Sequence, residues 1–446
     1  MRVLVIGGGI GGLAATLALR ARGVGVVVAE RAREYRACGA ALTLWPNATA
    51  VLRELGVLER VERAAWPVER SDVRTRSGRV LSRVRGGRIG RRMGAPVLAV
   101  HRWALQSALL EALKQQGGSE TERGAHAPAP VVRTGMRCVG VRLTARGAEA
   151  EFAGGDAGAG ATEKIGADVV VGADGLRSVV RAFVAGREEE PRSTGCVLYR
   201  GVVSVPLGGP VGGPVGSMSA GEALKELDAG VAFEAWHRGR RFAAARISAH
   251  EVAFFAGLRV GDEPLLESPA RGAELSTEDG ERALAWLRTE FAGWREPTPT
   301  LLGLARGEGL MRTELFDRPA LPSWRLGRVV LLGDAAHAMT PDLGQGACCA
   351  IEDAWALGAT LGGACGALRS GGCRARSRLI DGALDDYEGA RRARVARIAR
   401  ASRAATALSS WRSPVACAAR DALVGATPGV LVERRLLTML RAGGLG

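Results

Sequence analysis

Lysine is almost missing from this chain. Only Lys114, Lys164 and Lys225 occur among 446 residues, so the formal net charge of +15 comes almost entirely from arginine. The arginines are scattered over the whole length instead of forming one basic stripe interleaved with aromatic residues, which argues against nucleic acid as a partner. Two interpretations stay open: the basic surface attracts an anionic cofactor or substrate, or it reflects an arginine-biased coding composition.

Long apolar runs are absent as well. No run of about 18 or more apolar residues occurs, which argues against a transmembrane helix. Met1 directly precedes an apolar strand and leaves no room for a signal or transit peptide, so we expect a cytoplasmic protein. Because 47% of the 446 residues are apolar, the chain can build a large core, and its length predicts two or three domains.

The eight cysteines lack the spacing of a disulfide framework or a zinc site. They form no Cys-x-x-Cys pair and have no histidine partner at ligand spacing, and Cys348 and Cys349 are adjacent within a predicted helix. We interpret the cysteines as reduced thiols of the core and expect no metal.

The N-terminus carries a glycine-rich turn. An apolar strand at 2–6 is followed by Gly7-x-Gly9-x-x-Gly12, by a helix at 13–22 and by a second strand that ends at Glu30. In such a unit the first glycine makes the tight turn, the second lets the backbone reach a pyrophosphate, and the third lets the helix pack on the strand. Glu30 lies at the spacing expected for the acid that binds an adenosine ribose. The order of these elements predicts a dinucleotide-binding βαβ unit.

A second strand, turn and helix follow at 327–361. Residues 329–332 predict a buried strand with Asp334 at its carboxyl end, and a helix is predicted at 347–361. A carboxylate at this edge loses hydrogen bonds to water, which is unfavourable unless another group donates a hydrogen bond to it. A ligand hydroxyl is a natural donor at this position. Pro341 stiffens the turn, while Gly344 and Gly346 let backbone N–H groups approach a flat ring at the positive end of the helix. The alternative is an ordinary βα turn in which Asp334 only caps the helix.

Three other residues lie at similar positions. Asp174 follows the buried strand at 168–172 and precedes a helix. Arg102 in the first turn of a helix at 101–113 opposes the helix dipole, so either a bound anion lies nearby or the side chain is a solvated surface arginine. His337 lies in a tight turn, where histidine is more often a structural hydrogen-bonding residue, so we leave it out of the catalytic set.

Residues 190–300 change to short alternating runs. They predict antiparallel strands at 196–205, 231–236, 241–247 and 251–255, and residues 66–98 predict two or three more. The strands share an aromatic face, which is more often core than pocket: Tyr199, Trp236, Phe242 and Phe254. Loops are predicted at 117–130, 153–162 and 208–216.

From about residue 366 the chain is predicted to be helical and rich in arginine. The spacing of Leu384, Tyr387, Val395 and Ile398 predicts a buried stripe on one of these helices.

In this order and at these separations, the motifs around Gly7, Asp174 and Asp334 resemble those of the single-component (class A) FAD-dependent aromatic hydroxylases, typified by para-hydroxybenzoate hydroxylase. The resemblance covers nearly the whole chain. It implies an α/β fold with a Rossmann-like FAD-binding domain of the GR2 type, an antiparallel β-sheet substrate domain and a helical C-terminus. The expected parts are the FAD-binding domain at 1–65, 99–188 and 306–365, substrate-domain strands at 66–98, the substrate domain at 189–305, and C-terminal helices at 366–446.

The resemblance also implies roles for individual residues. The ADP half of FAD would contact Gly7, Gly9, Ile10, Gly11, Gly12, Glu30 and Arg31. The flavin and ribityl parts would be held by Arg36, Arg102 and Asp334, and Asp174 lies in the motif tied to both FAD and NAD(P)H. The isoalloxazine ring would be flanked by Pro341, Gly344, Gln345 and Gly346. Candidates for the substrate pocket are Tyr199, Arg200, Trp236 and Pro341.

The implied activity is that of a monooxygenase that uses FAD, NADH or NADPH, and O2. It would hydroxylate or epoxidise an electron-rich aromatic or polyene substrate through a C4a-hydroperoxyflavin, so that the cofactor supplies the electrophile. The runs Tyr199-Arg-Gly201 and Trp236-His-Arg-Gly-Arg-Arg-Phe242 are most similar to the branch with urate hydroxylase, salicylate hydroxylase and zeaxanthin epoxidase. The expected partners are small molecules, with no nucleic acid and no transmembrane segment, and the expected state is a monomer or homodimer.

Two alternatives stay open. The same fold serves flavin-dependent reductases, oxidases and halogenases, although the sequence has no Trp-x-Trp-x-Ile-Pro run of the kind that halogenases carry. The other alternative is a flavin-binding protein without turnover.

Overall fold

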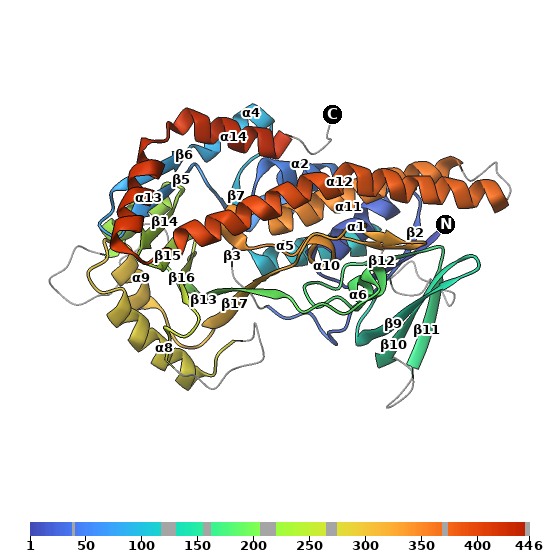
Figure 1. The fold of residues 1–446 in the computed structure, drawn as a ribbon, viewed down its shortest axis with the longest axis horizontal. Coiled ribbons are helices and arrows are strands. Elements are labelled where there is room, and N and C mark those ends of the chain that lie inside the picture. The colour runs from blue at the N-terminus through green and yellow to red at the C-terminus, as the bar shows by residue number, and fades with distance from the viewer. Residues whose placement is uncertain are drawn as a thin grey trace.

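The computed structural model describes residues 1–37, 41–116, 131–154, 162–205, 220–264, 274–367 and 373–441. The loops predicted at 117–130 and 208–216, and most of the one at 153–162, lie outside these residues. The described part holds a six-stranded and a seven-stranded sheet, and the long helix α12 (Cys373–Ser409) runs along the molecule past both of them (Figure 1).

The six-stranded sheet contains the predicted βαβ unit. Its strands are, in spatial order, β18 (Arg325–Leu326), β19 (Val329–Leu331), β12 (Val169–Gly172), β1 (Arg2–Ile6), β2 (Gly25–Ala29) and β8 (Val132–Arg133). All neighbours are parallel except β18 and β19. The helices around it are α1 (Ile10–Arg20), α5 (Arg102–Gln116), α6 (Val179–Ala185), α10 (Asp334–His337) and α11 (Gly346–Ala367). Parallel strands of Val, Ile and Leu need cover on both faces. The helices supply part of it, and a three-stranded sheet of β9 (Met136–Thr144), β10 (Gly147–Gly154) and β11 (Thr162–Ala167) contacts β1, β2 and β12 and adds Ala150 and Phe152 to the same core.

Helices α1 and α11 pack closely because one glycine allows it. A Cβ added at Gly358 would lie 2.6 Å from the Cβ of Ala18. Their contact holds the amino ends of both helices at the same edge of the sheet, where the two predicted glycine-rich turns lie.

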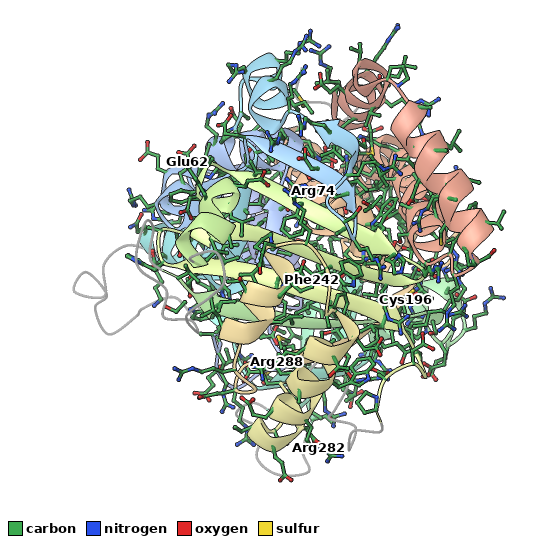
Figure 2. The ribbon with its side chains drawn as sticks, turned by 90° about the vertical axis from the view of Figure 1, so that its left-hand side faces the viewer. Glu62, Arg74, Cys196, Phe242, Arg282 and Arg288 are labelled. Carbon is green, nitrogen blue, oxygen red and sulfur yellow. The ribbon has the colours of Figure 1, made fainter. Side chains whose placement is uncertain are left out.

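The seven-stranded sheet is the expected antiparallel sheet. Its order is β17 (Met311–Asp317), β13 (Arg192–Ser204), β16 (Glu251–Arg259), β15 (Arg240–Ser248), β14 (Val231–His237), β5 (Arg70–Thr75) and β6 (Val80–Val84), and only β14 and β5 pair in parallel. On its outer face lie α8 (Thr277–Glu290) and α9 (Thr298–Leu304), with α7 (Ala220–Asp228) near β14 (Figure 2). Phe242 stacks on Phe254 and meets Phe291 there, with ring centroids 5.7 Å apart in each pair. Phe242 and Phe254 are core, as expected, and Tyr199 lies on the same face. The prediction is wrong for Trp236, which pairs with Arg241 and lies on the opposite face of the sheet.

Two small sheets complete the strands. The first is β3 (Ala41–Leu44), β7 (Leu98–His101) and β4 (Ala65–Pro67), and the second is β11 (Thr162–Ala167), β10 (Gly147–Gly154) and β9 (Met136–Thr144). Helices α2 (Pro46–Glu54) and α3 (Leu58–Arg63) follow β3. The β3-β7-β4 sheet packs on the inner face of the seven-stranded sheet through Val97, Ala99, Ile247 and Ala253.

The C-terminus is helical, as predicted. Helix α12 is followed by α13 (Pro414–Ala426) and α14 (Gly429–Arg441). The predicted stripe of α12 is at most 3% exposed at Leu384, Tyr387, Val395 and Ile398, and Tyr387 donates a hydrogen bond to the carbonyl oxygen of Leu331 (3.0 Å). In the described residues no single helix is long and apolar enough to cross a membrane; α13 and α14 together satisfy the same measure of length and apolar content, and they bend by 83° at their junction.

The strands β5 and β6 pair antiparallel, as predicted for residues 66–98, with β4 at the start of this stretch. Residues 86–93 form helix α4 (Gly86–Met93), which the sequence pattern did not predict. Ile89 and Met93 are four residues apart and pack on Leu437 and Leu440 of α14, so the period is helical. Gly94 ends the helix in a left-handed conformation, with φ of 69°. The helical spacing is difficult to recognise in the sequence, because most residues around these two apolar side chains are glycine and arginine. Strand β4 also joins the small sheet instead of the large one.

Candidate functional site

The turn between β1 and α1 contains three glycines at positions where the fold has no room for a side chain, and one where it has. A Cβ at Gly7 (φ 107°) would lie 2.3 Å from the carbonyl oxygen of Ala173, and one at Gly12 would lie 2.0 Å from the carbonyl oxygen of Gly7. Gly11 is also tight, because its Cβ would meet Leu332 at 2.8 Å. At Gly9 a Cβ would meet nothing within 4 Å. Gly9 therefore lines free space at the amino end of α1, the position that a pyrophosphate takes in such units.

Glu30 is held in place at the end of β2. Its two carboxylate oxygens accept hydrogen bonds from the backbone N–H groups of Gly8 (2.6 Å) and Ala32 (2.8 Å). Tyr35, which sequence reasoning missed, lies beside Gly8, and its buried hydroxyl has no hydrogen-bond partner among the described residues. Burial raises the pKa of Tyr35, and the negative charge of Glu30 adds to that rise. The hydroxyl is therefore a neutral donor next to the ribose-binding candidate.

The remaining predicted residues of this region have different environments. Ile10 is buried in the core, whereas Arg31, Arg36 and Arg102 are exposed. Arg36 pairs with Glu34, two residues away, in a contact open to solvent. Because the pair with Glu34 is exposed and therefore weak, the three arginines remain accessible to an anionic ligand.

Asp174 caps helix α6. Its carboxylate accepts hydrogen bonds from the hydroxyl of Ser178 (2.5 Å) and the N–H of Val179 (2.8 Å). Burial raises the pKa of Asp174, and the Ser178 hydrogen bond opposes that rise. Arg181 of the same helix donates to the carbonyl oxygens of Ala335 (3.2 Å) and Ala336 (2.8 Å), so the Asp174 motif is tied directly to the Asp334 motif.

Asp334 begins α10 directly after Gly333, whose φ of 61° turns the chain sharply. Its side chain is exposed, and no donor from the described residues contacts its carboxylate. The backbone around it is fixed, because the N–H of Gly333 donates to Asp353 (3.2 Å). Asp334 is thus a positioned carboxylate with free acceptor capacity, which fits a ligand hydroxyl.

Behind this turn lies a buried network of charges. His337 Nε2 lies 2.5 Å from Asp353 Oδ2, and Arg391 donates to Asp353 (2.7 Å) and to Glu352 (2.7 Å). Burial alone would raise the pKa of Asp353, but His337 and Arg391 outweigh it and lower the pKa to about 2. His337 also packs against the ring of Trp324, with centroids 5.2 Å apart. These contacts agree with the structural role expected of His337.

The turn from Pro341 to Gly346 contains a short 3₁₀ helix, η3 (Pro341–Leu343), and a left-handed Gly344 (φ 61°). A Cβ at Gly344 would lie 3.0 Å from Trp45 Nε1, whereas a Cβ at Gly346 would meet nothing within 4 Å. Gln345 is fully buried, and its Nε2 has no partner in the described part of the chain. The first residue of α11 therefore borders open space beside an unsatisfied donor, an arrangement that suits the edge of a flat ring.

Cys348 joins this turn to the small sheet. Its thiol lies 3.4 Å from the carbonyl oxygen of Gly344 and 3.7 Å from that of Thr43. Burial raises the pKa of Cys348 to about 12, so the residue is an unreactive thiol of the core. The cysteines that the structure describes are free thiols.

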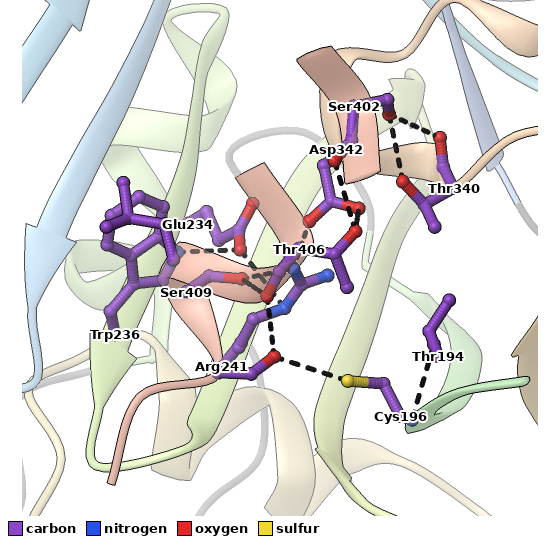
Figure 3. Close-up of polar contacts among 12 residues, drawn as sticks. Thr194, Cys196, Glu234, Trp236, Arg241, Thr340, Asp342, Ser402, Thr406 and Ser409 are labelled. Atoms are coloured by element: carbon purple, nitrogen blue, oxygen red, sulfur yellow. Dashed lines mark hydrogen bonds and ion pairs between the residues drawn. The ribbon is translucent and has the colours of Figure 1, made fainter. Parts of the chain in front are cut away.

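Asp342 forms a clamp with the seven-stranded sheet that sequence reasoning did not identify (Figure 3). Arg241 of β15 forms an ion pair with Asp342 and donates to the hydroxyl of Ser409 (2.8 Å), while Thr406 of α12 donates to the other oxygen of Asp342. Glu234 lies 3.3 Å from Arg241 on its other side. The clamp fixes η3 against both the sheet and α12.

The pairing of strands shows which substrate-pocket candidates lie together. Residues directly opposite each other in a sheet share a face. Arg200 pairs with Phe255, which pairs with Ala243, and Ala243 pairs with Glu234. Trp236 lies two residues from Glu234 and donates to it (2.7 Å), so Arg200 and Trp236 are on the same inner face.

Tyr199 lies on the opposite face. It is fully buried near Trp286 of α8, and its hydroxyl donates to Glu263 (2.8 Å). The structure therefore does not bring Tyr199 together with Arg200, because the side chains of adjacent strand residues alternate. Pro341 is exposed at the start of η3.

Arg200 is half-buried between charges of its own sign. Burial lowers its pKa to about 10, and the nearby Arg102 and Arg241 contribute to this shift. Among the described residues no acceptor forms a hydrogen bond or ion pair with its guanidinium. A hollow of about 160 Å³ begins at the following residues, Gly201 and Val202, and its border includes Glu274 and Glu308 but not Arg200.

These features fit FAD. Free space at Gly9 and Gly346, the free carboxylate of Asp334 and the unpartnered donors of Tyr35 and Gln345 lie along the edge where the two glycine-rich turns meet. FAD supplies redox and oxygen-transfer chemistry when it is bound, and the protein supplies position and a dry environment.

Comparison with known proteins agrees with this assignment. A family model described as "FAD binding domain" matches residues 1–205 and 317–402. The chain is 30% identical over 424 residues to the aurachin C monooxygenase/isomerase of Stigmatella aurantiaca, covering 95% of this chain and 94% of that protein. It is 31% identical over 392 residues to the FAD-dependent urate hydroxylase of Klebsiella pneumoniae, covering 88% and 86%.

Solved structures show the same fold. The structure of Klebsiella pneumoniae HpxO in complex with FAD and uric acid superposes with a TM-score of 0.78 at 26% identity, covering 100% of this chain and 98% of that one. A salicylate hydroxylase in complex with its substrate superposes with a TM-score of 0.68 at 23% identity, covering 100% and 99%. The chain belongs to the family of single-component FAD-dependent hydroxylases, and it is an FAD-dependent monooxygenase.

Proposed function

We propose that this monooxygenase hydroxylates a planar, electron-rich aromatic substrate that carries negative charge, with NADH or NADPH as reductant. The observation that carries the proposal is Arg200, a half-buried guanidinium without an anionic partner in the described part of the chain. A buried charge of this kind is unfavourable until an anion binds it. A phenolate, a carboxylate or an anionic purine supplies that charge, and a neutral polyene does not.

The surroundings of Arg200 support an aromatic substrate. The inner face of the sheet places Phe255 directly opposite Arg200 and Trp236 further along the same face. The clamp of Arg241 and Asp342 lies on this face too, so a ring bound at Arg200 would lie between the sheet and the turn that holds the flavin. The relatives named as urate hydroxylase and 3-amino-4-hydroxybenzoate 2-monooxygenase act on small aromatic compounds that are acidic.

In this proposal each residue has a limited task. Glu30 and Asp334 hold the hydroxyl groups of the two halves of FAD, and the amino end of α11 stabilises negative charge on the ring system. Arg200 orients the substrate by a charge-assisted hydrogen bond. The sequence carries one Gly-x-Gly-x-x-Gly fingerprint, so NAD(P)H would bind only transiently and without a domain of its own.

The test measures oxidation of NADH and NADPH with a panel of hydroxybenzoates, phenols, purines and neutral polyenes. We expect stimulation by anionic aromatic compounds and little by polyenes. Arg200→Gln should raise KM for the active compound by about 10- to 100-fold, the scale of a hydrogen bond to a charged group. The matched control is Arg259→Gln, on the exposed end of the neighbouring strand β16. Equal KM values for wild type and Arg200→Gln would refute the role of Arg200, and stimulation by polyenes alone would refute an anionic aromatic substrate.

A further inference from the structure

Helix α13 has an outer face without charge. All of its residues are described, and the exposed ones are proline, valine, alanine, leucine and glycine. Val415 is 81% exposed and Leu423 is 69% exposed, whereas the exposed large hydrophobic residues that the structure describes outside α13 and α14 are 36–44% exposed. A whole helix face of this kind is unusual on a surface in contact with water only.

The same surface continues on both sides of α13. Trp411 precedes the helix and is 41% exposed, and Val430 and Leu431 at the start of α14 are 69% and 47% exposed. Both helices lie at the margin of the molecule, on the side away from β9 to β11 (Figure 1). We call the surface formed by Trp411, Val415, Leu423, Val430 and Leu431 the apolar ridge.

The apolar ridge lies on the outer face of α13, because other residues of the helix pack inward. Arg420 is almost fully buried, lies over the ring of Trp236 at 5.2 Å from its centroid, and donates to Asp421 (2.8 Å). Cys417 is buried too, and its thiol lies 3.1 Å from the carbonyl oxygen of Trp411. These contacts fix the orientation of α13, and the ridge therefore faces outward.

Exposed arginines lie along α14 and on the helix packed against it. Arg434, Arg435 and Arg441 are exposed on α14, and Arg91 and Arg92 are exposed on α4, which packs against α14. Within the residues that the structure describes, none of these five forms an ion pair. The ridge is thus an apolar strip with free positive charge beside it, on a protein whose net charge is +15.

We propose that the apolar ridge docks on the surface of an anionic lipid bilayer, with the apolar side chains in the interface and the arginines on lipid phosphates. An apolar helix face with neighbouring basic residues is the pattern of interfacial binding. A second copy of this chain fits less well, because a self-complementary contact would bring the unpaired arginines of two ridges together. The proposal concerns attachment to a surface and is independent of which substrate the enzyme takes.

The test is co-sedimentation of the FAD-loaded, full-length enzyme with vesicles. One set contains equal parts of phosphatidylglycerol and phosphatidylcholine, and the other contains phosphatidylcholine alone. We expect binding to the anionic set that weakens when salt is raised from about 0.1 M to about 0.5 M, because screening shortens the range of the charges. Binding to neutral vesicles should be much weaker.

Two variants separate the apolar from the charged contribution. Leu423→Gln with Val430→Gln should lower the partition constant by about tenfold or more, since each removes a large apolar side chain from the interface. Arg434→Gln with Arg435→Gln should lower it by about fivefold for each arginine, and only on anionic vesicles. The matched controls are on β9, away from the ridge. Val139→Gln makes the same kind of substitution at a valine that is 42% exposed, and Arg137→Gln removes an exposed arginine on the same strand.

FAD content and the thermal melting temperature of each variant show whether it is folded, because the substituted side chains are exposed. The proposal is refuted if wild type does not bind anionic vesicles, or if the ridge variants bind as wild type does. It is also refuted if light scattering shows a dimer that Leu423→Gln with Val430→Gln dissociates, because the ridge is then an interface between two copies.

Discussion

Replacing Arg241 by methionine tests whether the clamp holds the turn from Pro341 to Gly346 in place. The side chains of Arg241 and Asp342 are each 5% exposed, and the guanidinium also bonds Ser409 (2.8 Å) and lies 3.3 Å from Glu234. Methionine keeps much of the volume and removes the charge. Asp342 then remains buried with the hydroxyl of Thr406 as its donor.

The size of the effect follows from these contacts. Removing one partner of a buried ion pair lowers the free energy of unfolding by about 3–5 kcal/mol. Burial already raises the pKa of Glu234, so this carboxyl can take up a proton when Arg241 is lost. That protonation relieves part of the penalty, and we expect a loss of about 3 kcal/mol. Because η3 is released from the sheet, the dissociation constant of FAD should also rise.

The assay is urea denaturation of the flavin-free protein together with fluorescence titration of FAD. The neighbouring Arg240→Met is the matched control, because Arg240 pairs with Glu290 on the opposite face and these side chains are 28% and 24% exposed. A partly exposed pair of this kind contributes about 0–1 kcal/mol. If Arg241→Met destabilises the protein no more than Arg240→Met, the clamp does not hold the turn.

Three further predictions concern the turn and its support. Asp334→Ala should weaken FAD binding by about 1–3 kcal/mol without lowering stability of the flavin-free protein, since the carboxylate contacts no donor from the described residues; an unchanged FAD dissociation constant contradicts it. Gly346→Val should leave the flavin-free protein folded and impair FAD binding and substrate-stimulated NAD(P)H oxidation, whereas Gly12→Val should destabilise the fold itself, as urea denaturation and FAD titration of both variants would show. Asp353→Asn tests the buried network. The pKa of Asp353 is about 2 in the folded protein and about 3.9 in the unfolded chain. The ionised carboxylate therefore contributes about 2–3 kcal/mol to the free energy of unfolding above about pH 4, and this contribution is lost as pH falls toward 2. Urea denaturation should show a gap between wild type and Asp353→Asn that narrows over that range, and a gap independent of pH would contradict the assignment.

Local patterns were sufficient to predict the two glycine-rich turns. Each consists of an apolar strand, a turn and a helix that are contiguous in sequence, so the positions of Gly7, Glu30 and Asp334 could be predicted before their contacts were known. The antiparallel strands of 190–300 were predicted for the same reason, because alternation is a local signal. The face to which each strand residue points is harder to predict from sequence. Tyr199 and Arg200 are both candidates for the substrate pocket by sequence, although adjacent strand residues face opposite ways.

Long-range contacts could not be predicted. The clamp joins Arg241, Asp342 and Thr406 across 101 and 64 positions of sequence, and no local pattern marks any of the three. The same holds for Arg181, which reaches the backbone of Ala335 and Ala336 across the sheet. Helix α4 was missed because its apolar period rests on only two residues, Ile89 and Met93.

Transfer of oxygen from O2 to substrate tests the central claim most directly. The purified, FAD-loaded enzyme is incubated under isotopically labelled O2 with NADH or NADPH and the aromatic compound that stimulates oxidation most. The mass of the product is then measured by mass spectrometry. The account predicts slow NAD(P)H oxidation without substrate, a marked rise with it, and one labelled oxygen atom in each product molecule. Stimulated oxidation with a product that carries no labelled oxygen would contradict the account and identify the protein as a reductase or an oxidase.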